Sequence, residues 1–113
     1  MRILSVTAQK PHATGSGFYL CEVVGALAGL GHCQSVIAGV YGEDQVTLPP
    51  GVAFYPVYFN TPALPFPIVG MSDEMPYPST RYREMDGAMT AQFKAAFTQA
   101  LQEACLLYTS RCV

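Results

Sequence analysis

The sequence predicts an α/β domain with a parallel sheet and flanking helices, and three observations carry that expectation. A short apolar segment at 3–8 leads through Gly15-Ser16-Gly17 into an apolar-periodic segment that ends at Leu30. A second apolar segment, 34–40, follows directly. Strand, helix and strand in this order are typical of a right-handed crossover, which makes the two strands parallel.

Composition limits the class of protein further. The 113 residues allow one domain with a modest core, and because half of them are hydrophobic and only 12% are charged, disorder is not expected. A net charge of −2 without a Lys/Arg cluster argues against binding to nucleic acid. The most apolar window, 17–31, contains Glu22 and is shorter than the ~20 residues of a membrane span. We expect no integral membrane segment and no signal peptide. The expected location is cytoplasmic, and a peripheral position at the inner face of the membrane is compatible with it.

The first strand and helix are expected at 3–8 and 17–30. Bulky apolar residues throughout 3–8 predict a strand buried on both faces. In the helix, apolar residues recur at i, i+3, i+4 and i+7; they are Leu20, Val23, Val24, Leu27 and Leu30. Gly31 is expected to end the helix in the left-handed conformation, and Gly25 and Gly29 to allow close packing on the sheet.

The rest of the domain is expected to add two strands and a helix. A buried strand at 34–40 and a polar turn at 41–51 precede a third strand, 52–59, whose Pro56 favours a position at the sheet edge. Residues 60–85 have no period, and a loop of this length is usually functional or mobile. Asp86 is a candidate N-cap of a helix over 87–104. The apolar stripe of that helix is Met89, Phe93, Ala96, Phe97, Ala100 and Leu101.

The cysteines and the last nine residues bear on the domain limits. The cysteines at 21, 33, 105 and 112 form no CxxC pair, so neither a disulfide framework nor a metal site is expected. Cys21 and Cys33 are expected to be small buried hydrophobic residues. Residues 105–113 lack a helical or strand period and resemble the translation of a transposon mosaic-end sequencing adapter. We therefore expect a partial domain at 1–104 and a non-native tail at 105–113.

Gly15-Ser16-Gly17 is the first candidate site. Glycines let the backbone approach a ligand, and the first turn of the following helix offers N–H groups and the positive end of the dipole to a phosphate. Leu20 replaces the third glycine of a dinucleotide fingerprint, and no acidic residue ends the second strand. The alternative is a tight turn without a ligand.

Polar residues on two loops form a second candidate site. Lys10 and His12 follow the first strand at its carboxyl end, where open α/β sheets bind ligands; a solvated His12 is the alternative. Hydroxyl, carboxylate, arginine and tyrosine side chains at 70–83 are of the kinds that contact sugars or planar groups. Asp73 and Glu74 could include a general base or be merely solvated, and His32 is expected to lie at a helix end. The candidate ligand-binding residues are His12, Ser72, Asp73, Glu74, Tyr77, Arg81 and Arg83.

Several segments carry a resemblance to a known family. They are the first strand Met1–Leu4, the glycine turn, Leu27 to His32 and Ser35 to Gly39, together with the loop segment 65–77, which is similar to one in a bacterial subgroup. Over 1–104 the chain resembles the N-terminal Rossmann-like domain of retaining GT-B glycosyltransferases of the family 4 type.

The resemblance implies the acceptor-side half of an enzyme that moves a sugar from a nucleotide-diphosphate donor to an acceptor hydroxyl. It gives Gly15, Ser16 and Gly17 a donor-phosphate role, and 72–83 a role towards an acceptor sugar or lipid-linked glycan. It implies no cofactor beyond the nucleotide sugar and no metal. The active-site His and donor-gripping residues of the family have no counterpart here, so no catalytic residue is assigned. The missing C-terminal domain would be the natural partner, and the chain alone is expected to be inactive.

Two other classes stay open from the residues themselves. A fragment of a Rossmann or flavodoxin-like oxidoreductase would be favoured by an acidic residue that ends the second strand. A non-catalytic interaction module would use the apolar segment 65–77 as its partner surface.

Overall fold

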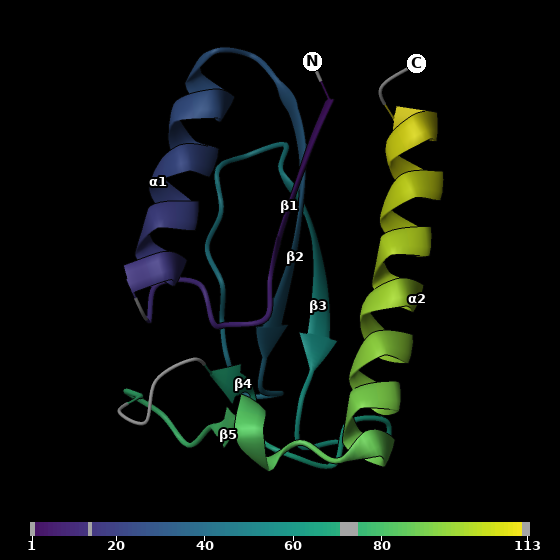
Figure 1. The fold of residues 1–113 in the computed structure, drawn as a ribbon. Helices are drawn as coiled ribbons and strands as arrows, with labels where there is room; N and C mark the ends of the chain where they lie inside the picture. Colours follow the sequence, from purple (N-terminus) through teal and green to yellow (C-terminus); the bar gives the residue numbers. More distant parts are fainter. Residues whose placement is uncertain (1, 14, 71–74, 112–113) are drawn as a thin grey trace.

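The computed structural model describes residues 2–13, 15–70 and 75–111; the side chain of Ser16 and those after Ala104 lie outside this description. A three-stranded parallel sheet has the order β1-β2-β3, with β1 at Arg2–Thr7, β2 at Cys33–Val40 and β3 at Ala53–Tyr58. Helices α1 (Gly15–Gly29) and α2 (Gly87–Arg111) lie on opposite sides of the sheet (Figure 1). The predicted α/β class with a parallel sheet and flanking helices is confirmed.

The centre of the sheet is β2, and β1 is an edge strand. Residues 34–40 are all buried, with Val36 and Ala38 packed against Val24 of α1 and Ile37 in the cluster on the α2 side. Residues of β1 are only half-buried or exposed, so the prediction of a strand buried on both faces was wrong. The physical reason is that β1 pairs only with β2 in the described sheet. The edge position predicted for the strand with Pro56 is confirmed.

Helix α1 begins two residues earlier than predicted and ends as expected. The N–H groups of Gly31 and His32 donate to the carbonyls of Ala28 and Leu27, and φ at Gly31 is 81°. This is the Schellman pattern, in which only glycine adopts the left-handed conformation without strain. Leu30 is exposed, although it was predicted to belong to the apolar stripe.

Two glycines of α1 do not serve close packing. Gly25 and Gly29 are exposed, and a Cβ at either position would have no atom within 4 Å. The prediction that they let the helix approach the sheet was therefore wrong, because they lie on the solvent side of α1.

The segment between β3 and α2 is largely part of the core. It contains β4 (Val69–Gly70) and β5 (Thr80–Arg81), which pair as two parallel strands, and the 3-10 turn η1 (Tyr82–Glu84). Its large apolar side chains Leu64, Phe66 and Ile68 are buried. They face inward, so among the described residues of 65–77 the apolar surface required by an interaction module is not found.

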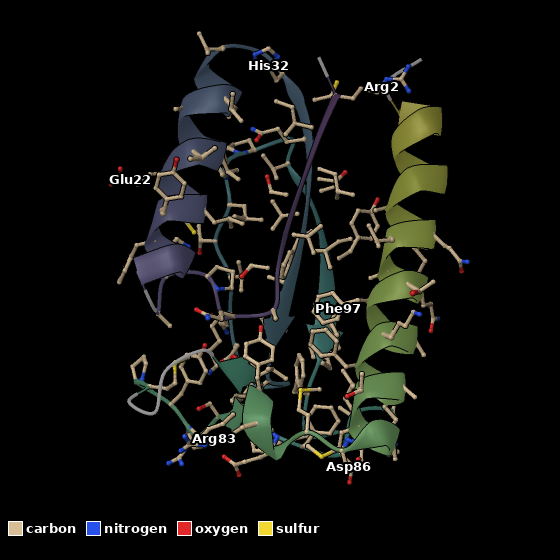
Figure 2. All side chains as sticks on the ribbon, viewed as in Figure 1. Arg2, Glu22, His32, Arg83, Asp86 and Phe97 are labelled. Atoms are coloured by element: carbon tan, nitrogen blue, oxygen red, sulfur yellow. The ribbon has the colours of Figure 1, made fainter. Side chains whose placement is uncertain are left out.

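Helix α2 packs on the sheet through the predicted stripe. Figure 2 shows Phe97 pointing from α2 towards the sheet, and its ring lies 4.7 Å from that of Phe93. Leu101 is the exception, because more than a third of it is exposed. The helical backbone continues to Arg111 rather than ending near Ala104. Backbone helix needs no apolar period, so this geometry leaves the origin of 105–113 a prediction.

Neither described cysteine is a buried core residue. Cys33 is exposed and Cys21 is half-buried. The prediction failed because Cys33 stands at the start of β2, where the strand leaves the turn at Gly31, and Cys21 lies on the side of α1 that contacts the exposed His12.

The N-cap predicted at Asp86 is present. The Met89 N–H donates to the Asp86 carboxylate at 2.8 Å, as an N-cap residue requires. We expect Asp86→Ala to lower the free energy of unfolding by about 1 kcal/mol, since the first turn of α2 loses this acceptor. Urea denaturation of both proteins measures the change. Asp86→Asn retains a capping oxygen and is the matched control; an equal loss in Asn and Ala would contradict the capping role.

Candidate functional site

The loops that follow β1 and β2 meet at the carboxyl end of the sheet through an ion pair. The Lys10 Nζ lies 2.9 Å from the Asp44 Oδ1, and both side chains are mostly buried. The second carboxylate oxygen of Asp44 accepts the Tyr41 N–H at 2.8 Å. The carboxylate is thus fixed from both sides, and the pair joins the two loops.

Two tyrosine rings surround the Lys10 ammonium. Its Nζ lies 4.5 Å from the centre of the Tyr41 ring and 4.9 Å from that of Tyr77, within cation–π range. The Lys10 N–H also donates to the Tyr77 hydroxyl at 3.3 Å. Burial raises the pKa of Tyr77, and the neighbouring Tyr41 and Asp44 act in the same direction. Tyr77 therefore remains a neutral phenol at pH 7.

The Tyr41 hydroxyl fastens the segment between β3 and α2 to this site. It accepts the buried Ile68 N–H at 3.1 Å and donates to the Pro78 carbonyl. Tyr41 itself directly follows β2 and is buried. A single side chain thus holds both ends of the 68–78 segment against the carboxyl end of the sheet.

Tyr41→Phe is expected to lower the free energy of unfolding by about 2 kcal/mol. The substitution keeps the ring but leaves the Ile68 N–H and the Pro78 carbonyl without this partner, and an unpaired buried polar group costs about 1–3 kcal/mol. Chemical denaturation gives the value. Tyr19→Phe, at a tyrosine of α1 that is 73% exposed, is the control without effect. Equal stability of the Tyr41→Phe variant and the parent would contradict the role of this hydroxyl.

A cavity of about 220 Å³ adjoins the ion pair. Lys10, Asp44 and Gln45 supply its polar wall, and the remaining lining residues are Pro11, Ala13, Val40 and Val46. Ala13 stands just before the start of α1 in the sequence, and Val40 is the last residue of β2. The cavity therefore lies where open α/β sheets bind ligands.

His12 is exposed and bridges the two loops. Its φ of 66° is in the left-handed region, which a non-glycine residue adopts at a cost. The Nε2 lies 3.1 Å from the Thr47 carbonyl and 3.4 Å from the Cys21 Sγ. A carbonyl can only accept, so the hydrogen bond to Thr47 requires a proton on Nε2. A protonated Nε2 has no lone pair with which to accept the Cys21 thiol proton. Burial raises the pKa of Cys21, which also disfavours a reactive thiolate.

The three residues of the predicted glycine turn lie in the first turn of α1. Gly15 is the exposed first residue of the helix and Gly17 is buried. Among the described glycines, positive φ occurs only at Gly31 and Gly51, so 15–17 is not the special turn that was predicted. Figure 1 shows this end of α1 at the same end of the molecule as the carboxyl ends of the strands.

The structure brings only part of the predicted acceptor group to this site. Tyr77 joins Lys10, as described, whereas Ser72, Asp73 and Glu74 lie outside the described residues. Arg81 on β5 makes an exposed ion pair with Glu84 at 3.4 Å. Figure 2 shows Arg83 at the end of the molecule where the strands finish, and His32 at the opposite end, so His32 belongs to no common site with His12.

Sequence reasoning missed Tyr41 and Asp44. Both lie in 41–51, which was interpreted only as a polar turn. The signal was available, because the loops that follow two neighbouring parallel strands meet at one edge of the sheet. Applying this rule to the second loop as well as to the first would have placed Asp44 near Lys10.

Comparison with known proteins assigns no family: no family model, no curated protein and no solved structure matches the chain. Within the described part of the chain, no helix is long and apolar enough to cross a membrane. In the same residues, no group of three or more His, Cys, Asp or Glu is placed to hold a metal ion. The function has to be argued from the site itself.

Proposed function

We propose that the chain is the acceptor-side part of a retaining glycosyltransferase that uses a nucleotide-diphosphate sugar. One observation carries the proposal: the cavity beside Lys10 and Asp44 and the first turn of α1 occupy the same end of a parallel β-α-β unit. Ligands of open α/β sheets bind in this position. The resemblance of 1–104 to the N-terminal Rossmann-like domain of GT-B enzymes supports the reaction class.

In this proposal the diphosphate of the donor approaches the first turn of α1. The helix dipole places positive potential at the first turn of α1. Departure of a nucleoside diphosphate develops negative charge, which this potential stabilises. Gly15 and Gly17 carry no side chain that would hinder the approach.

The proposal also covers the limits of the domain. Residues 1–104 form the glycosyltransferase part, 105–113 are a non-native tail, and the activity belongs to a longer chain that supplies the opposite wall of the cleft. The cytoplasmic location, with a peripheral position at the membrane, and the glycan or lipid-linked acceptor belong to this proposal as well.

One observation favours a second class, the dinucleotide-dependent oxidoreductases. Asp44 lies four residues after the end of β2, close to where such proteins place the carboxylate that binds the ribose. The Lys10 ammonium pairs with this carboxylate, which makes the site less acidic than that role requires. The glycosyltransferase therefore remains the first candidate.

Binding of inorganic pyrophosphate to the 113-residue chain tests the donor part of the proposal. We expect the backbone amide resonances of 15–17 to shift in a ¹⁵N-edited NMR titration, with millimolar affinity. Sodium sulfate at equal ionic strength is the control and should shift them less. Shifts spread evenly over the surface, or none at 15–17, would contradict a donor-phosphate site at α1.

A further inference from the structure

We infer that the cavity between the loops after β1 and β2 binds a neutral ligand with vicinal hydroxyls, which in the proposed reaction is the ring of the acceptor sugar. The identification of this ligand as the acceptor rests on the proposed function. The preference for a neutral diol rests on the chemistry of Lys10 and Asp44. The sequence places Lys10 on the candidate loop after the first strand, whereas it does not indicate a role for Asp44.

The charges of the cavity select a neutral ligand. Lys10 and Asp44 lie 2.9 Å apart, so the positive and negative groups largely cancel at the cavity wall. An anion that approached Lys10 would meet the Asp44 carboxylate, and a cation that approached Asp44 would meet the Lys10 ammonium. A hydroxyl group suits both, because it accepts from the ammonium and donates to the carboxylate.

Both charged groups retain hydrogen-bonding capacity beyond the contacts described above. Asp44 uses one oxygen for Lys10 and the other for the Tyr41 N–H, and each oxygen has a second lone pair. The ammonium has three protons, of which Asp44 takes one, and the Tyr41 and Tyr77 rings cover part of its remaining surface. Adjacent hydroxyls of one ring could therefore bind the pair together, and the amide of Gln45 at the same wall offers a further donor and acceptor.

The shape and the remaining lining agree with a single sugar ring. Pro11, Ala13 and Val40 give the cavity an apolar wall, which suits the C–H face of a sugar. The cavity volume of about 220 Å³ limits the ligand to a small ring rather than a whole oligosaccharide. The part of the ligand that receives the new bond would extend towards the first turn of α1, which follows Ala13 in the chain.

A titration with methyl α-glucoside and myo-inositol tests the inference on the 113-residue chain. We expect the amide resonances of Lys10, Asp44 and Gln45 to shift, and glucuronate, which differs by a carboxylate, to bind more weakly. Ala13→Leu should weaken binding about tenfold, the effect of losing about 1.4 kcal/mol, because it fills the cavity without touching the ion pair. Ala88→Leu on the exposed start of α2 is the matched control and should not change it.

The charge-neutral double variant Lys10→Gln/Asp44→Asn completes the design, because it leaves neither partner as an unpaired charge. It should also lower the affinity about tenfold while its spectrum stays that of a folded protein. Tighter binding of glucuronate, or no shift at Lys10 and Asp44 with either neutral compound, would overturn the inference.

A further titration with NAD distinguishes the two ligands that could supply a vicinal diol, an acceptor sugar and the ribose of a dinucleotide. Shifts at both 15–17 and Asp44 with NAD, at lower concentration than with the glucoside, would support the diol site and overturn the glycosyltransferase proposal. Shifts at 15–17 with pyrophosphate and none at Asp44 with any sugar would overturn the acceptor site and leave the donor proposal standing.

Discussion

Gly39→Ala is expected to lower the free energy of unfolding by about 3 kcal/mol. Gly39 lies near the end of β2, where a Cβ would fall well inside van der Waals contact of the Ala8 carbonyl oxygen and 2.8 Å from the Phe59 ring. The first of these neighbours is backbone and cannot rotate away. The end of β1 would have to leave β2, which would also displace the loop that carries Lys10.

Urea denaturation followed by circular dichroism measures this loss. Gly25→Ala is the matched control, since Gly25 is exposed on α1 with no atom within 4 Å of its would-be Cβ. Alanine is the better helix former there, so the control should gain about 0.5–1 kcal/mol. Equal stability of the two variants would show that the end of β1 is not seated on Gly39.

Phe59→Ala is expected to cost about 4 kcal/mol, in the range for loss of a large aromatic residue from a core. Phe59 is 1% exposed and directly follows β3. Its ring lies 5.8 Å from Phe66, 6.3 Å from Phe93 and 6.4 Å from Phe97. It therefore joins the sheet, the segment before β4 and helix α2 in a single cluster.

A small domain can lose its fold after a change of this size, so Phe59→Leu provides a second, milder measurement. The leucine variant should stay folded and lose less stability than the alanine variant. Phe18→Ala is the control, because Phe18 is 56% exposed on α1. A loss at Phe59 no greater than that at Phe18 would contradict the position of Phe59 in the core.

The fold class could be predicted from the sequence because the β-α-β unit has a strong local signal. The segment 34–40 is mostly apolar and is buried on both faces, and Gly31 ends α1 as expected. The burial of β1 could not be predicted in the same way. A run of apolar residues indicates that a strand is suited to a buried position. Whether it is buried depends on the strand order, which decides whether the strand has a neighbour on each side.

The long segment between β3 and α2 shows a second limit. Leu64, Phe66 and Ile68 alternate with Pro65 and Pro67, and because proline disfavours a paired strand, the sequence does not mark them as core residues. They are buried in a cluster with Ile37, Tyr41 and Phe97, all of which are distant from them in the sequence. Local patterns carry no information about such contacts.

The location of the candidate site was predicted from the sequence, but its residues were predicted only in part. The rule that ligands bind at the carboxyl ends of parallel strands correctly directed attention to the loop with Lys10 and His12. The ion pair with Asp44 was missed because two loops had to be considered together. His12 turned out to connect those loops through Thr47, a role that its sequence neighbours do not indicate.

The sequence of the uninterrupted gene around this chain tests the central proposal most directly. We predict that the natural frame departs from the present sequence after Glu103 and continues into a strand that carries a His. A second Rossmann-like domain with an acidic donor motif should follow. A natural frame that encodes residues 105–113 as they stand and then closes would contradict both the glycosyltransferase proposal and the assignment of the tail.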